Sequence, residues 1–522
     1  MDWICRLGKV DLAIAISSRP VAGRRAQVRI LDEPTGLEPT GLVGQVIRSG
    51  KGKIAMANAR FFRIWGFLAC LCALFALLAT PAQAEDSVRL RPAAQPDALR
   101  RVGISLEVSG HLLVHAEGKD TRLPMEVDAL VRHQERLVPP VGEPGSAAPL
   151  RSVRFYDEVK ADLKIEDQQL HPKLSEDRRL MVASLADSRV VLRRPAGALT
   201  REELDLVELP GDSLMIDRLL PDDNQPRTLN ATWKQSEETM ALLFGLDAVG
   251  HADVESKLYE LTDKLAKIEM TGTVHGAIDG IATKIELKCR YYFHRQRRQI
   301  NGLELHWQEE REVGHVSPGV DVAARLKMHL APLDSSEPLA VDQLQSLDLD
   351  EDEGLALLEF VTADRRVRFL HDRRWHVTGE VGQRLAMRLV DDGELIAQCN
   401  VLDLKPLKEG ERISLEDFQA DVKRVLGAKF GQFVRAKQSM DEADRVVYRV
   451  EVAGRVAELP IRWIYYLVSA RDGRRVSLVF TMEESLLESF AMADQVIVSS
   501  LEMLTGRETQ AAAEATSDAP RR

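Results

Sequence analysis

The chain has 522 residues, of which 45% are hydrophobic and 29% are charged, and its formal net charge is −11. This composition excludes global disorder, and the length provides for two or three domains, each with its own core. From Glu85 onward 59 Lys and Arg stand against 76 Asp and Glu, a net charge of −17, which excludes nucleic acid and anionic lipid surfaces as partners.

The segment 56–84 has the order of features that is typical of a signal peptide. Two arginines precede an uncharged run at 65–79, and small residues at Ala82 and Ala84 stand just before Glu85. The run is shorter than the roughly 20 residues that a membrane-spanning helix needs. We therefore expect cleavage before Glu85 and an extracytoplasmic protein, either periplasmic or secreted. An uncleaved N-terminal anchor is the alternative, and it would be the protein's only contact with a membrane.

Residues 1–55 precede this signal peptide and carry neither a periodic apolar pattern nor a motif. Because signal peptides normally begin a chain, we expect that translation starts at Met56 and that 1–55 is a wrongly assigned leader. A genuine extended leader is the alternative.

The segment 85–330 is expected to form an antiparallel-sheet domain with few helices. Apolar and polar residues alternate on both sides of a turn at 117–120, as they do in half-buried strands. Thr200 followed by Glu203 predicts the capping box of a short helix. A further helix is predicted over 226–245, and it includes Trp233.

The later part of this domain predicts more strands. Residues 258–274 fit either a helix or strands, and we expect strands because β-prone residues end the segment. Strict alternation over 285–293, followed by Asn301 and Gly302, predicts a hairpin whose turn is formed by those two residues. The result is a curved antiparallel sheet.

A Pro-, Ser- and Asp-rich stretch at 331–354 indicates an acidic linker to a second domain at 355–506. In that domain Asp392 and Gly393 predict a tight hairpin turn. Ser414 predicts the cap of a helix that ends at Gly427.

Four strand candidates follow, and then a terminal helix. Thr481 and Glu484 predict its capping box, and Gly506 predicts its end. Residues 507–522 are expected to be a disordered tail. The predicted fold class is therefore α+β in two domains, with a curved antiparallel sheet first and an antiparallel sheet with two helices second.

The order of elements over about 355–504 resembles the PsbP-like α/β/α sandwich, which LpqN-type exported lipoproteins also resemble. The likeness rests on strands, a capped helix, a long meander with a Trp-bearing strand and a terminal amphipathic helix. It implies a binding or assembly module and transfers no functional residues. The first domain is similar to uncharacterised exported domains of bacterial envelopes, and more weakly to the half-barrels of carriers such as LolA.

One candidate metal site lies in the acidic linker. Asp348, Asp350, Asp352 and Glu359 have the spacing of positions 1, 3, 5 and 12 of a calcium loop. The sixth position, which needs glycine, is Glu353. A solvated acidic linker is therefore the preferred interpretation, calcium is the alternative, and no other cofactor is expected.

One candidate ligand site lies near the predicted hairpin. Tyr291 with Arg295 and Arg297 could suit an anionic ligand or an aromatic stacking surface. The structural alternative is a solvated strand end that pairs with the acidic residues near Glu309 across the hairpin.

The chain carries no G-x-S-x-G, H-E-x-x-H, Walker or G-x-G-x-x-G motif. Cys289 and Cys399, the two cysteines after Glu85, are expected to be buried structural thiols. We expect a non-enzymatic exported protein that binds an unknown envelope protein or organises the envelope. The alternatives are a periplasmic carrier of a small apolar ligand and an enzyme with dispersed acid–base residues.

Overall fold

The computed structural model describes residues 86–504 except for 94–96, 117–118, 139–149, 187–188, 348, 350–355, 409 and 442. The expected leader, signal peptide, cleavage site and tail therefore lie outside the described residues. Within the described ranges, no helix is both long enough and apolar enough to cross a membrane.

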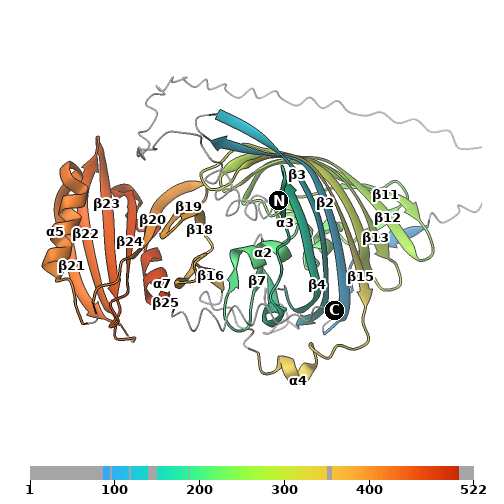
Figure 1. Ribbon diagram of the computed structural model, residues 1–522. Coiled ribbons are helices and arrows are strands. Elements are labelled where there is room, and N and C mark those ends of the chain that lie inside the picture. The colour runs from blue at the N-terminus through green and yellow to red at the C-terminus, as the bar shows by residue number, and fades with distance from the viewer. Residues whose placement is uncertain are drawn as a thin grey trace, which may run out of the picture. The chain divides into compact units, whose positions relative to one another are not determined.

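The first large element is a strongly curved antiparallel sheet, which contains twelve strands among the described residues (Figure 1). Its order is β10-β11-β12-β13-β14-β15-β2-β3-β4-β6-β7, with β5 on the side of β4. The strands on one side are β10 (Thr232–Lys234), β11 (Ala248–Leu261), β12 (Leu265–Ile278), β13 (Ile281–His294), β14 (Gln299–Arg311) and β15 (Gly319–Pro332). Those on the other are β2 (Leu99–Ala116), β3 (Lys119–Val138), β4 (Leu150–Ile165), β5 (Gln168–Leu170), β6 (Leu180–Ala186) and β7 (Arg189–Arg193). The predicted strands on both sides of 117–120, and those over 258–274, are confirmed.

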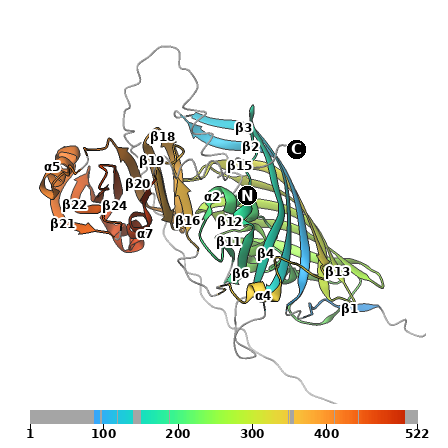
Figure 2. The same ribbon diagram turned by 60° about the horizontal axis from the view of Figure 1, so that its bottom comes forward.

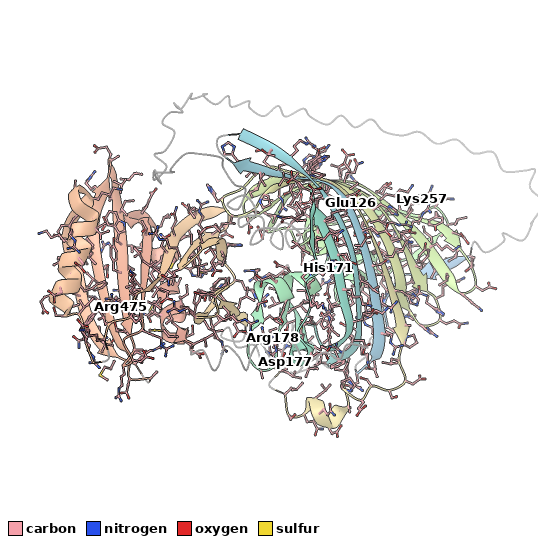
Figure 3. All side chains as sticks on the ribbon, viewed as in Figure 1. Glu126, His171, Asp177, Arg178, Lys257 and Arg475 are labelled. Atoms are coloured by element: carbon pink, nitrogen blue, oxygen red, sulfur yellow. The ribbon has the colours of Figure 1, made fainter. Side chains whose placement is uncertain are left out.

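The two faces of this sheet differ in polarity because side chains alternate along each strand. In β13, for example, Ile285, Leu287 and Cys289 are buried, whereas Glu286 and Lys288 between them are not. Figure 3 shows exposed charged side chains of the sheet such as Lys257. We call the apolar face the inner face and the polar face the outer face.

Most residues of 199–246 pack on the inner face, but 232–234 form strand β10 of the sheet itself, and 199–200 and 226–228 pair with other strands. The segment contains α2 (Arg201–Val207), the short 3-10 helix η2 (Ile216–Leu219) and α3 (Glu237–Phe244). The ring of Phe244 at the end of α3 meets Trp307 of β14 with centroids 6.0 Å apart. The chain itself thus covers the inner face.

Two helix predictions for this region have different outcomes. The capping box of α2 is confirmed, since Thr200 accepts from the Glu203 backbone and Glu203 accepts from the Thr200 backbone. The helix predicted over 226–245 begins only at Glu237, and Trp233 lies in β10, where it pairs with Ser256. The indole nitrogen of Trp233 donates to the Leu219 carbonyl at 3.1 Å, a long-range contact that helical periodicity cannot reveal.

The second large element is a seven-stranded antiparallel sheet in the order β18-β19-β20-β24-β23-β22-β21, seen with α5 in Figure 2. Its predicted strands and hairpin turn are confirmed, with positive φ at Asp392 and Gly393. Helix α5 (Leu415–Leu426) begins after Ser414, whose side chain accepts from the Asp417 backbone. The strands are β18 (Trp375–Val381), β19 (Arg384–Asp391), β20 (Glu394–Leu404), β21 (Phe430–Met440), β22 (Val446–Val456), β23 (Leu459–Ser469) and β24 (Arg475–Glu483).

The long terminal helix is a wrong prediction. Thr481 lies in β24, where it pairs with Gln398 and Trp463, so it cannot cap a helix. The helical part is split into α6 (Leu487–Phe490) and α7 (Ala493–Ser500), because Ala491 between them has φ 47°.

A small four-stranded sheet completes the fold, in the order β25-β17-β16-β8. Its members are β25 (Glu502–Met503), β17 (Val367–His371), β16 (Leu358–Val361) and β8 (Leu199–Thr200), and a separate pair joins β1 (Ser87–Arg89) to β9 (Pro226–Thr228). The described chain is mostly antiparallel sheet with few helices, consistent with the α+β class. The domain boundaries at 330, 354 and 506 remain predictions.

Candidate functional site

The β13–β14 hairpin differs from its prediction in a way that creates a surface feature. Its turn lies at 295–298, where Arg298 has φ 53° and donates its backbone N–H to His294. Asn301 and Gly302 lie inside β14 instead. Gly302 pairs with Tyr292 and Ile300 pairs with Phe293, so Asn301 is the extra residue of a β-bulge. Such bulges re-aim side chains and are common beside functional sites.

Below the bulge, four residues of neighbouring strands lie in one row across the outer face. Lys267 pairs with Tyr292, Tyr292 with Gly302, and Gly302 with His329. Because Gly302 has no side chain, the row is interrupted between Tyr292 and His329. A Cβ placed on Gly302 would lie 3.5 Å from Cδ2 of Tyr292, so the tyrosine ring leans over the glycine.

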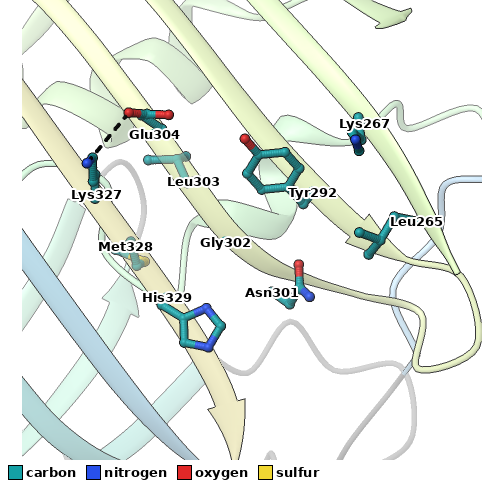
Figure 4. A pocket seen from close by; sticks show the side chains of 10 residues that line it. All are labelled: Leu265, Lys267, Tyr292, Asn301, Gly302, Leu303, Glu304, Lys327, Met328 and His329. Carbon is teal, nitrogen blue, oxygen red and sulfur yellow. Dashed lines mark ion pairs between the residues drawn. The ribbon is translucent and has the colours of Figure 1, made fainter. Parts of the chain in front are cut away.

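This interruption is a hollow of about 410 Å³ that is open to solvent. Its volume falls in the range of small-molecule sites, roughly 300–1,000 Å³. Figure 4 shows Tyr292 and His329 on either side of Gly302, with Lys267 and Lys327 farther out. The polar groups at its edge are those of Lys267, Tyr292, Asn301, Glu304, Lys327 and His329.

The charges around the hollow are unevenly paired. Arg325 donates to Glu304 at 2.5 Å, and this hydrogen bond holds the pKa of the Glu304 carboxyl below its usual value. Lys327 lies 4.0 Å from the same carboxylate and is half exposed. Lys267 pairs at 2.9 Å with Glu260, away from Lys327. Glu304 thus has three basic neighbours, since His306 lies 3.6 Å from it, and Lys327 is the most distant of the three.

The Glu304 carboxylate is suited to binding a cation more than to general-base catalysis. A carboxylate that is held ionised by Arg325 is a weak general base near neutral pH. The ring of Tyr292 offers an apolar surface, and Asn301 and Lys327 offer hydrogen-bond donors beside it.

The structure does not bring the predicted ligand residues Tyr291, Arg295 and Arg297 together. Tyr291 is fully buried on the inner face, where its hydroxyl donates to the Leu219 carbonyl at 2.9 Å. Arg295 forms a bidentate pair with Asp86 at 3.0 and 3.2 Å. Arg297 is exposed in the turn.

The structure does not form the alternative pairing of this strand end with acidic residues across the hairpin. Glu309 lies opposite Ile285 and Glu310 opposite Lys284, far along the strands from the turn. The predicted pairing assumed a turn at Asn301 and Gly302, and the register changes once the turn lies at 295–298.

Of the calcium candidates, Asp348, Asp350 and Asp352 lie outside the described residues. Glu359 lies in β16, and its two carboxylate oxygens pair at 2.5 Å with Arg178 and Arg368. Arg178, which Figure 3 marks, also donates to Glu203 at 2.7 Å. Glu359 therefore already has two cationic partners.

A buried ionic network that the sequence did not predict fastens 199–246 to the sheet. Arg154 of β4 and Glu135 of β3 face each other at 2.9 Å, and both are almost fully buried. Arg154 also binds Asp212 with two hydrogen bonds of 2.6 and 2.7 Å. Ser213 donates to Glu135 at 2.9 Å. The arginines Arg100 and Arg154 lower the pKa of Glu135 against the effect of its burial, which would raise it.

His133 and Tyr156 lie directly beside this network, with ring centroids 5.0 Å apart. Within the described part of the chain, neither ring nitrogen of His133 has a hydrogen-bond partner. Burial, aided by the positive charge of Arg154, lowers the pKa of His133 from 6.5 to about 3. The imidazole is therefore neutral at physiological pH.

Cys289 and Cys399 are free and buried, as predicted. They lie in different sheets, on β13 and β20. Burial raises the pKa of both thiols, which makes them poor nucleophiles.

Comparison with known proteins identifies no family. No protein-family model matches the sequence, and no curated protein matches it. Among solved structures the chain is similar to the PsbP protein CyanoP from Synechocystis sp. PCC 6803, with 16% identity over 32% of this chain and 99% of that one, and a TM-score of 0.24. It is also similar to lipovitellin, with 8% identity over 48% of this chain and 27% of that one, and a TM-score of 0.26.

A third similarity is to a BenF-like porin from Pseudomonas fluorescens Pf-5, with 7% identity over 74% of this chain and 98% of that one. Its TM-score is 0.11. TM-scores this low carry no argument about function. The LolA-like interpretation of the first domain gains no support from these similarities.

Proposed function

We propose that the protein is an exported, non-enzymatic binding protein and that the hollow at Gly302 is its site for a small ligand. The observation that supports the proposal is the bulge at Asn301, which places Gly302 between Tyr292 and His329 and leaves a hollow of about 410 Å³ on the outer face. Export is supported by the signal-peptide pattern of 56–84. The PsbP-like assignment of 355–504 belongs to this proposal and rests on element order.

The rival function, a carrier of an apolar ligand on the concave face, has weaker support. Residues 199–246 already cover that face, and charged contacts such as Arg154–Asp212 hold them there. An apolar ligand would have to displace this segment.

The test uses the full-length precursor, expressed in a bacterial host and purified from the extracytoplasmic fraction. Its mass is recorded under denaturing and then native conditions, beside the variants Gly302→Leu, which fills the hollow, and Gly302→Ala, which barely changes it. We expect a denatured mass that begins at Glu85, and a native excess mass that Gly302→Leu loses and Gly302→Ala keeps.

A denatured mass that retains Met56 would contradict export with cleavage. An excess mass that Gly302→Leu retains would place the ligand elsewhere. A ligand-free wild-type protein that no small ring compound stabilises against heat would contradict the binding function.

A further inference from the structure

We infer that the hollow takes a small ring compound that carries a carboxylate, such as a sugar acid or an aromatic acid. The inference rests on the binding function proposed above and names the chemical class of the ligand. It follows from the shape of the row through Gly302 and from the charges at one side of it.

The shape favours a flat ring. Tyr292 and His329 are two strands apart, about 10 Å at the usual strand spacing of about 4.8 Å. The tyrosine ring leans over Gly302, which contributes no side chain of its own. A ring compound in the hollow would lie between the side chains of Tyr292 and His329, which flank Gly302 (Figure 4).

The charges favour an anion on that ring. Lys327 stands at the wall of the hollow, and the nearest carboxylate, that of Glu304, is engaged by Arg325 at 2.5 Å and lies 4.0 Å from Lys327. A ligand carboxylate at hydrogen-bonding distance would be a closer partner for Lys327 than Glu304 is. Asn301 at the bulge can donate a second hydrogen bond from its amide.

Binding is measured by calorimetry with four probes, namely glucuronate and benzoate as carboxylates, and glucose and benzyl alcohol as uncharged rings of similar size. The variants are Lys327→Gln, Gly302→Leu and the control Lys284→Gln. Lys284 lies on the same strand and face as Tyr292, eight residues or about 26 Å away, and its change alters the net charge equally.

We expect at least one carboxylate to bind at least tenfold more tightly than its uncharged counterpart. Lys327→Gln should remove that preference, Lys284→Gln should keep it within twofold, and Gly302→Leu should abolish binding of all probes. Preference for glucuronate or for benzoate then assigns the sugar or the aromatic source. Affinity should also fall as salt rises, in the wild type more than in Lys327→Gln.

Equal binding of charged and uncharged rings, lost in Gly302→Leu, would overturn this inference and leave the binding function standing. A carboxylate preference that survives Lys327→Gln would also overturn it. Failure of all four probes to bind the folded wild-type protein would overturn this inference about the ligand class, whereas the binding function is decided by the native excess mass and its loss in Gly302→Leu.

Discussion

Tyr291 and Tyr292 are consecutive in β13 and serve opposite faces of the same sheet. Inside the core, the hydroxyl of Tyr291 donates to the Leu219 carbonyl at 2.9 Å and lies at hydrogen-bonding distance, 3.1 Å, from the Ser256 hydroxyl. The ring of Tyr292 lines the hollow on the outer face. Two adjacent tyrosines thus have different roles, because Tyr291 is part of the core and Tyr292 is part of the candidate ligand site.

Removing the guanidinium of Arg154 should destabilise the protein strongly. In Arg154→Met the buried carboxylate of Glu135 loses a partner, and Asp212 loses two hydrogen bonds. We expect the free energy of unfolding in urea to fall by about 3–5 kcal/mol. The control Arg132→Met breaks the exposed pair with Glu158 and should cost less than about 1 kcal/mol. Equal losses in both variants would show that the network does not anchor 199–246.

Stability should decrease as the pH falls from 7 to 5. The unfolded imidazole of His133 takes up a proton near pH 6.5, whereas the folded one stays neutral down to about pH 3, so the unfolded state binds more protons in this window. One such group contributes a slope of at most about 1.4 kcal/mol per pH unit. His371, whose pKa burial lowers to about 4, acts in the same direction.

Urea unfolding at several pH values checks this, with His133→Phe and His371→Phe alone and combined. Each substitution should make the free energy of unfolding depend less on pH, and the double variant should show the weakest dependence. An unchanged slope in the double variant would show that other groups cause the dependence.

Deleting Asn301 should leave the sheet intact. Ile300 would then precede Gly302 directly, and the buried and outer faces would alternate without interruption, because Ile300 and Leu303 already face inward. We expect native circular dichroism and a change of less than about 2 kcal/mol in unfolding free energy. Deleting His306, in the regular part of β14, turns its flanking segments to opposite faces and should prevent folding. If the variant that lacks Asn301 fails to fold, Asn301 is not the extra residue of a β-bulge.

Both cysteines after Glu85 should resist alkylation in the native protein. Their thiols are buried and their pKa values are raised, so the reactive thiolate is scarce. Iodoacetamide at pH 8 should add no mass to a chain beginning at Glu85 until urea unfolds it, when two adducts appear. A native adduct on Cys289 would show that β13 opens.

Much of the local structure could be predicted because it depends on neighbours in sequence. Alternation placed the strands, and the caps at Thr200 and Ser414 were correct because a cap needs only a few adjacent residues. The same alternation could have separated the tyrosines, since Tyr291 shares the parity of Ile285 and Cys289 and Tyr292 does not. The sequence prediction therefore chose Tyr291 for the candidate ligand site, although the alternation of the strand could have indicated its neighbour Tyr292.

The failures arose where distant segments decide the structure. Thr481 and Glu484 satisfy a helix cap in sequence, but pairing of Thr481 with Gln398 and Trp463 extends the strand. The contact of Arg154 with Glu135 depends on a shift of register between Arg132 and His133, and its contact with Asp212 joins segments 58 residues apart. The hollow depends likewise on the pairing of Gly302 with both Tyr292 and His329.

The pairing of β15 with β2 also sets the order in which the chain can fold. The pairing runs from Gly319 opposite Leu113 to Pro332 opposite Arg100. Each residue is more than 200 positions away in sequence from the residue it pairs with. During synthesis one edge of strand β2 therefore stays unpaired until residue 332 has left the ribosome. The apolar side chains of β2 stay exposed for the same time. Contacts so far apart in sequence slow folding and prolong exposure to aggregation. A protein shortened before 319 would lose one of the twelve strands of this sheet together with every later element, and it would leave β2, in the middle of the sheet, permanently without its second neighbour.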